Sequence, residues 1–165
     1  MSILRYCTLA LGLTLAACAG HDLRPGIATE VDVRQQMGPP AMQWDLAEGK
    51  RQLAYPRGPM GYQTYMIVLN ADGRVERNEN VLNAESFAGI RAGMTQADVM
   101  RLIGPPQPQW ETYFAARDEL VWEWRYCNAW SEPARFNVLF DGSSLLVRST
   151  LAQSESQRGY RRERC

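Results

Sequence analysis

The chain has 165 residues, and its 18 Lys and Arg balance 18 Asp and Glu, so the formal net charge is zero. This balance excludes the basic footprint of a nucleic-acid-binding protein. The length suits one domain or two small ones.

Residues 1–17 are expected to be a signal peptide. A short cationic start precedes an apolar stretch over residues 6–15, which is shorter than the roughly 20 residues needed to span a bilayer. The stretch ends in Leu15-Ala16-Ala17-Cys18, which resembles the lipobox of bacterial lipoproteins. The resemblance implies cleavage between Ala17 and Cys18 and acylation of Cys18. The alternative is an ordinary secretory signal that happens to contain a cysteine.

The lipobox also carries an expectation about location. Several acyl chains on one cysteine anchor a protein stably without any transmembrane helix. In the sorting system that handles such lipoproteins, an Asp after the cysteine retains the protein at the inner membrane, and here that residue is Ala19. We therefore expect a lipid anchor, palmitate included, on the periplasmic face of the outer membrane, with residues 18–25 as the tether.

An internal repeat organises the rest of the chain. Residues 29–44 align with residues 95–110 at a constant offset of 66 (95 − 29), and 8 of the 16 aligned positions are identical. About one identity would be expected by chance, so the chain contains two related copies. We assign residues 26–82 to the first copy, 83–152 to the second, and 153–165 to a basic C-terminal tail, with the division between domains near residues 80–84.

Each copy begins with a helix whose two ends are recognisable. Thr29 and Thr95 stand where N-caps are expected, each followed three residues later by an Asp that can complete a capping box. Gly38 and Gly104 are expected to adopt the left-handed conformation, with a positive φ, after the last helical residue, and the Pro-Pro pairs that follow prevent continuation. The alternative is that "GPP" is a proline-rich ligand for a partner. A further short helix is expected over residues 84–90, whereas the first copy has only a turn in the corresponding place.

Strand patterns follow each helix. The first copy predicts strands over residues 52–55, 62–69 and 74–82, and the second over 120–127, 136–140 and 145–150. Val68-Leu69 is aligned with Val138-Leu139, at an offset of 70 (138 − 68). The predicted fold class is α+β: two tandem small domains, each with one or two short helices packed on a three-stranded antiparallel meander.

The second copy resembles a known family. Its "GMTQADVMRLIGPP", "VWEWRY" and "FNVLFDG" are similar to the pattern of the SmpA/OmlA, or BamE-like, outer-membrane lipoproteins, over residues 82–150 and more loosely over 23–82. The resemblance implies helices packed on a three-stranded sheet and a non-catalytic role in inserting β-barrel proteins into the outer membrane. The matching residues are caps, turns and core positions, so they indicate fold and not a binding site.

Catalysis has few candidate residues. The one histidine, His21, lies in the expected tether, and the glycines form no phosphate-binding loop. We expect no enzyme activity, no metal, no cofactor, no small-molecule substrate and no nucleic acid.

Protein binding is the favoured class of function, with outer-membrane assembly proteins as the expected partners. The alternative is a periplasmic enzyme inhibitor that uses a broad sheet surface across both copies, similar in layout to the β-lactamase inhibitory proteins. Four aromatic residues are candidate partner contacts, and core packing is the alternative role for each of them: Trp110, Tyr113, Phe114 and Trp130.

Two cysteines remain after the expected cleavage, Cys127 and Cys165. An oxidising compartment favours a disulfide between them, and the alternative is two free thiols. Cys127 has the strand parity opposite to Trp122, Trp124 and Tyr126, so a disulfide would hold the tail on the less aromatic face. The tail is locally basic and either contacts anionic lipid headgroups or is a solvated terminus.

Overall fold

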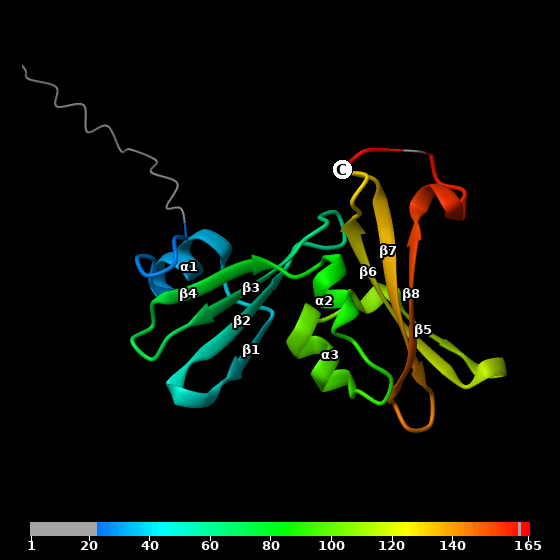
Figure 1. The fold of residues 1–165 in the computed structure, drawn as a ribbon, viewed down its shortest axis with the longest axis horizontal. Helices are drawn as coiled ribbons and strands as arrows, with labels where there is room; N and C mark the ends of the chain where they lie inside the picture. The colour runs from blue at the N-terminus through cyan, green and yellow to red at the C-terminus, as the bar shows by residue number, and fades with distance from the viewer. Residues whose placement is uncertain (1–22, 162) are drawn as a thin grey trace, which may run out of the picture.

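The structure is a computed structural model that describes residues 23–161 and 163–165. It is α+β, as expected, with two separate four-stranded antiparallel sheets, one from each copy of the repeat (Figure 1). Cys18, Ala17 and His21 lie outside the described residues. Among those residues, no helix is both long and apolar enough to cross a membrane.

Each sheet has one strand more than the predicted three-stranded meander. Sheet 1 follows the order β1 (Met42–Asp45), β2 (Arg51–Pro56), β3 (Thr64–Leu69), β4 (Val75–Asn80), and sheet 2 the order β5 (Glu111–Phe114), β6 (Glu119–Cys127), β7 (Pro133–Asp141), β8 (Val147–Ser154). The additional strands are the first in each sheet, β1 and β5, at 4 residues each. They are too short to show an alternating apolar pattern, and pairing with the neighbouring strand defines them instead.

The helices begin where the sequence predicts. They are α1 (Glu30–Met37), α2 (Ala84–Ala88) and α3 (Gln96–Ile103). Capping boxes are present at both copies of the motif: the Thr29 hydroxyl accepts from the Asp32 amide and the Thr95 hydroxyl from the Asp98 amide, while each Asp accepts from its cap. Asp98 has a lowered pKa because its carboxylate accepts hydrogen bonds from the Thr95 side chain and backbone.

The two "GPP" segments end their helices through glycine. Gly38 has φ 80° and ψ −164°, and Gly104 has φ 79° and ψ 174°. The expected positive φ is confirmed, but ψ is extended, which places both residues in a region that is essentially restricted to glycine. The ligand interpretation is wrong for the second copy, because Pro106 is buried and the indole Nε1 of Trp124 donates to the Pro105 carbonyl at 3.2 Å.

The strand register corrects the alignment of the two copies by one residue. The buried pair Leu53 and Ile67 of sheet 1 corresponds to Trp122 and Val138 of sheet 2. A register shift then follows between Val68 and Leu69 in one sheet and between Leu139 and Phe140 in the other. The offset is therefore 71 (138 − 67), not 70, and because strand side chains alternate, Leu139 faces away from the core that Phe140 fills.

The elements stack in the order α1, sheet 1, α2 with α3, sheet 2 (Figure 1). One core lies between α1 and the front face of sheet 1, with Val33, Leu53 and Ile67 fully buried. The larger core joins α2, α3 and the inner face of sheet 2, and it also includes Ala54 and Met66 from the back face of sheet 1. The second pair of helices is thus packed between the two sheets.

Candidate partner-binding surface

The back face of sheet 1, which is the face turned away from α1, binds the end of helix α3. On it, Gln52 pairs with Val68 and Ala54 with Met66. The Gln52 side chain donates to the Arg101 carbonyl of α3 at 2.7 Å. A Cβ built on Gly104 would lie 2.7 Å from Thr64 Cγ2 and 3.6 Å from Met66 Cε. The end of α3 is therefore in direct contact with this face.

Among the described residues, no α-helix lies on the equivalent face of sheet 2. In the corrected register, Gln52–Val68 of sheet 1 corresponds to Val121–Leu139 of sheet 2, and Ala54–Met66 corresponds to Glu123–Asn137. The next pair, Pro56–Thr64, corresponds to Arg125–Arg135. We call these six residues of sheet 2 the outer face. It differs from its counterpart by replacing Ala54 and Met66 with Glu123 and Asn137. The charged residues make it a polar surface where sheet 1 has an apolar one.

An ion-pair network covers the part of the outer face formed by Glu123, Arg125 and Arg135, which lies next to the disulfide. We call this part the upper half and the part formed by Val121 and Leu139 the lower half. Glu155, at the start of η4 (Glu155–Arg158), accepts from Arg125 Nε at 2.7 Å and from Arg135 Nε at 2.6 Å. Glu123 accepts from Arg135 at 2.9 Å and from Arg158 at 2.6 Å. Burial by itself would raise the pKa of Glu155, but the hydrogen bonds and charges of Arg125 and Arg135 outweigh it, and the pKa is lowered. Glu155 is therefore held as a carboxylate.

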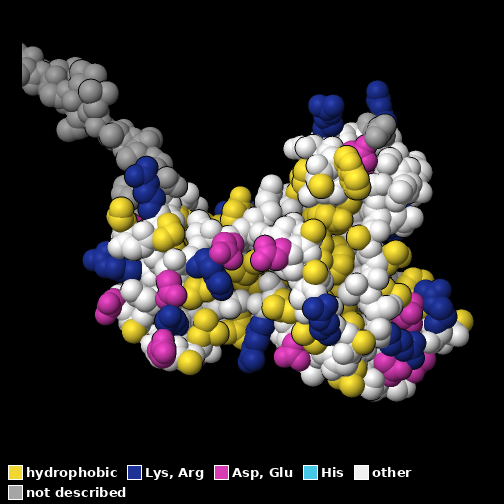
Figure 2. All heavy atoms as spheres, viewed as in Figure 1, with side chains coloured by type: hydrophobic (Ala, Val, Ile, Leu, Met, Phe, Trp, Pro, Cys, Tyr) yellow, Lys and Arg dark blue, Asp and Glu magenta, His cyan; other side chains and the backbone are white. Residues whose placement is uncertain are grey.

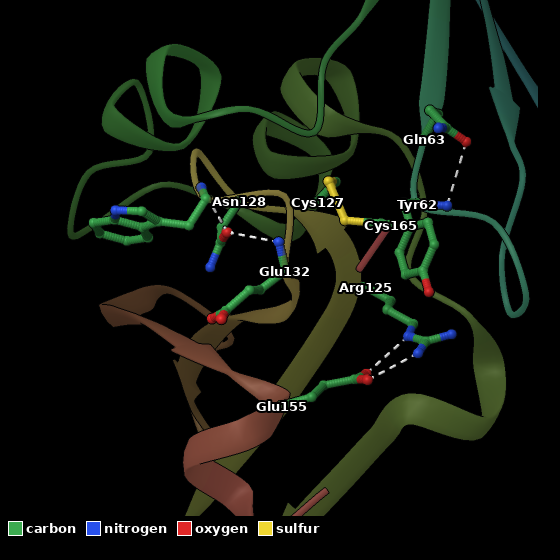
Figure 3. Close-up of a disulfide and its surroundings, with 9 residues drawn as sticks. Tyr62, Gln63, Arg125, Cys127, Asn128, Glu132, Glu155 and Cys165 are labelled. Atoms are coloured by element: carbon green, nitrogen blue, oxygen red, sulfur yellow. Dashed lines mark hydrogen bonds and ion pairs between the residues drawn. A yellow bond between two sulfur atoms is a disulfide. The ribbon is translucent and has the colours of Figure 1, made fainter. Parts of the chain in front are cut away.

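Aromatic rings complete this network from both sides. The Arg125 guanidinium lies 4.6 Å from the ring centroid of Tyr62, which belongs to the loop between β2 and β3 of the first copy. Arg135 lies 4.3 Å from the ring centroid of Trp110. Trp110 is therefore half-buried and packs against the Arg135 guanidinium. Figure 3 shows Tyr62, Arg125 and Glu155 together near the disulfide.

The disulfide joins Cys127 at the end of β6 to Cys165, with a Cα–Cα distance of 5.9 Å. The Cys165 amide also donates to the Ser131 carbonyl at 3.0 Å. As the strand parity predicts, the tail is held on the outer side of sheet 2. Glu155 is buried at 5% exposure, whereas residues 157–161 and 163–165 are exposed, as a solvated terminus would be.

Trp130 is held in a rigid turn at the same end. The Asn128 side chain accepts from the amides of Trp130 and Glu132 at 2.9 and 3.0 Å, next to the disulfide (Figure 3). The Trp130 side chain nevertheless is 79% exposed, and Met60, in the loop that carries Tyr62, is 80% exposed. Lys or Arg side chains project beside apolar ones at this end of the molecule (Figure 2). An ordered turn that presents an exposed Trp is typical of a contact residue.

The lower half of the outer face is more apolar. Val121 and Leu139 are half-buried there, and Leu151 of β8 and Phe114 of β5 lie on the same face and are exposed. The Arg117 guanidinium lies 4.6 Å from the Phe114 ring centroid. Tyr113, by contrast, points to the other face, and its hydroxyl donates to Asp118 at 2.7 Å. Charged side chains of both signs surround the β5 end (Figure 2).

The four predicted contact residues therefore do not form one site. Trp110 lies under Arg135, Tyr113 and Phe114 lie on opposite faces of β5, and Trp130 lies in the turn near the disulfide. Sequence reasoning missed Leu139 and Leu151, because the strands of the two copies were aligned one residue out at Leu139 and the last predicted strand ended at residue 150, before Leu151. The described residues include no group of three or more His, Cys, Asp or Glu side chains placed to hold a metal ion.

Comparisons with known proteins assign no family. No family model matches the chain, and no curated protein matches it in sequence. The crystal structure of a DUF4309 family protein (YjgB) from Bacillus subtilis subsp. subtilis strain 168 is similar at 16% identity, over 81% of this chain and 83% of that one, with a TM-score of 0.27. At that TM-score the similarity carries no argument about fold or function.

Proposed function

We propose that the chain is a non-catalytic protein-binding module of an outer-membrane lipoprotein, acting in β-barrel protein assembly or envelope integrity. One structural observation carries the binding role. The back face of sheet 1 binds a helix of the next copy, whereas among the described residues the outer face of sheet 2 carries no α-helix and is covered, near Arg125 and Arg135, by the C-terminal segment with Tyr62 and Trp110. The proposed contact surface is formed by Val121 and Leu139 of the outer face together with Leu151 of β8, which lies beside Asn137.

The location and partner class rest on sequence. The lipobox ending at Cys18 supports the lipid anchor, and the likeness of residues 82–150 to the BamE-like pattern supports the choice of outer-membrane assembly proteins as partners. The enzyme-inhibitor alternative depended on a broad surface shared by two adjoining meanders. It has less support here, because α2 and α3 lie between the two sheets and occupy the faces that point toward each other.

Capture from membranes tests the proposal. The tagged, lipidated protein is solubilised in mild detergent, and co-purifying proteins are scored for barrel-assembly components and for periplasmic hydrolases. Leu139→Glu places a charge in the middle of the contact surface, and Leu102→Glu is the control, because Leu102 is 37% exposed on α3, away from that surface. We expect Leu139→Glu to reduce recovery of assembly components at least about tenfold and Leu102→Glu to leave it unchanged.

Two results would count against the proposal. Recovery of a periplasmic hydrolase in place of assembly components would favour the inhibitor function. Equal recovery by the wild type and Leu139→Glu would move the contact surface elsewhere, with Trp130 as the next residue to test.

A further inference from the structure

The edge of sheet 2 formed by β8 is only partly covered. The Val147 amide donates to the Met94 carbonyl at 2.9 Å, and the Val147 carbonyl accepts from the Gly93 amide at 2.8 Å. At the other end, Glu155 leaves the sheet and starts a 3-10 turn. Among the described residues, Arg148 to Ser154 have no backbone–backbone hydrogen bonds beyond those to β7, and only the Ser154 amide bonds a side chain outside β7, donating to Gln157 at 3.3 Å. This segment is a free strand edge, and its midpoint is Leu151.

The corresponding edge of sheet 1, formed by β4, carries more charged residues than β8 does. Val75 of β4 is covered in the same way, by Gly26 and Ala28. The rest of β4 carries Glu76, Arg77 and Glu79, and charged residues on an edge oppose the addition of another strand. The free part of β8 carries one charged residue, Arg148, and Leu151 at its midpoint is 54% exposed.

We propose that this edge pairs with β8 of a second copy of the chain, antiparallel and centred on Leu151. That register places Leu151 opposite Leu151 of the second copy, Thr150 opposite Ala152, Ser149 opposite Gln153, and Arg148 opposite Ser154. No like charges oppose each other, and the apolar side chain lies at the two-fold axis, as a self-complementary interface requires. The same construction on β4 would place Asn78 at the axis and desolvate Glu76, Arg77 and Glu79 of both copies.

The pairing joins two 4-stranded sheets into one of 8 strands (4 + 4). Residues directly opposite each other on antiparallel strands point to the same side of the sheet. The two outer faces therefore lie side by side on one surface, with Leu151 of each copy at the centre and Asn137 and Glu123 directly outward from it. Leu139 and Val121 lie in the neighbouring row, which continues from Ser149. The inference concerns self-association and stands whether or not the proposed assembly partners are correct.

Cross-linking of the full-length lipidated protein in its membrane tests the register. Leu151→Cys places one new thiol at the proposed axis, and a short bis-maleimide reagent removes any dependence on disulfide geometry. Asn78→Cys, at the midpoint of the free part of β4, is the matched control. We expect Leu151→Cys to give a covalent dimer at least about fivefold more abundant than that from Asn78→Cys.

A second measurement determines the oligomeric state of the protein without cross-linking. Sedimentation of the detergent-solubilised protein is expected to show a concentration-dependent dimer for the wild type and a monomer for Leu151→Asp, which opposes two carboxylates at the axis. A thermal midpoint of Leu151→Asp close to the wild-type value shows that the protomer is intact. Equal cross-linking of the two cysteine variants, or a wild-type dimer that survives Leu151→Asp, would overturn the proposal.

Discussion

Gly104 of the second copy lies directly against Thr64 of the first, so close that a Cβ on the glycine would lie 2.7 Å from Thr64 Cγ2. Its counterpart Gly38 has almost the same backbone conformation, but in the part of the chain that the structure describes nothing beyond its own neighbours lies within 4 Å of such a Cβ. The two copies thus provide a matched pair in which one glycine serves the turn alone and the other serves the turn and the contact between copies.

Alanine at these two positions is expected to separate the two roles. Gly38→Ala should cost about 1–3 kcal/mol of unfolding free energy, because alanine is strained at this φ and ψ. Gly104→Ala should cost about 1–3 kcal/mol more, because Thr64 must also move. Gly104→Val should be worse still. Urea unfolding measures the difference, and equal losses at the two sites would show that the contact with Thr64 is not tight.

The disulfide should stabilise the fold strongly. It closes a loop with a sequence separation of 38, for which the chain-entropy relation gives roughly 4 kcal/mol. Cys165→Ser should therefore lower the thermal midpoint by many degrees, and hydrogen exchange should show faster opening of Glu155–Arg158. Unchanged exchange there would mean that the ion pairs alone hold the segment.

Loss of the buried carboxylate tests the ion-pair network. Glu155→Gln leaves Arg125 and Arg135 without their shared anion and should cost roughly 1–3 kcal/mol, below the cost of a fully buried pair because the neighbouring rings and Glu123 remain. Glu79→Gln is the control: its ion pair with Arg77 is exposed at 3.5 Å and should contribute under about 0.5 kcal/mol.

The same network sets a dependence on pH. The folded pKa of Glu155 lies below its ordinary value of 4.5, so its contribution is complete above that value and is lost as the pH falls through the folded pKa. Asp141 behaves alike, since hydrogen bonds from the Ser144 backbone and side chain, and then from Arg148, lower its pKa from 3.8 to about 2. Stability should be level from pH 7 to about 5 and fall below about 4.5. Glu155→Gln should make that fall shallower, and an unchanged slope would contradict the assignment.

Residues 82–165 are expected to fold without the first copy, because they contain a full sheet, both helices and the disulfide. Their stability should be reduced, since removing the back face of sheet 1 uncovers one side of α3, and burying a single Met side chain is worth roughly 1.5–3 kcal/mol. Thermal unfolding of the fragment by circular dichroism measures this. A fragment without a cooperative transition would show that the two copies form one indivisible domain.

Acylation of Cys18 is a separate prediction, based on the lipobox alone. Cys18→Ala should accumulate as unprocessed precursor or as a form without lipid, and mass spectrometry of the purified protein distinguishes the two. Normal cleavage with an unmodified cysteine at the new N-terminus would refute the lipoprotein assignment.

Local signals predicted the local structure well. Thr95 and Asp98 need only each other to form a capping box, and Gly104 takes its positive φ from the helix that it ends, so both features can be inferred from neighbouring residues. The register shift at Leu139 and Phe140 could not be inferred that way. A single extra residue in a hairpin leaves the sequence pattern almost intact but reverses which side chains face the core.

Contacts between the copies were also beyond sequence reasoning. The helical period predicts that Leu102 shares one apolar face with Val99 and Ile103, yet it is 37% exposed on α3, while Val99 and Ile103 are fully buried. Helix α3 packs between two sheets, so its buried positions depend on contacts with both of them. The spacing of apolar residues along a helix predicts only one buried face. The pairing of Arg125 with Tyr62 joins residues 63 positions apart (125 − 62) and has no signature in the sequence.

Because helix layers and sheets alternate, further units of this fold could be added by stacking in one direction. Each sheet offers, on the side away from its own helix, a surface on which the helices of one more unit can stack, as α3 does on sheet 1. Glu123, Arg125 and Arg135 close that route in the second unit, because a further helix would have to displace Glu155 and desolvate these charges. The polar network is thus a terminal cap of the kind that solenoid proteins place on their last repeat. Replacing it with the apolar pairs of sheet 1 would be the first step in building a longer array from the same unit.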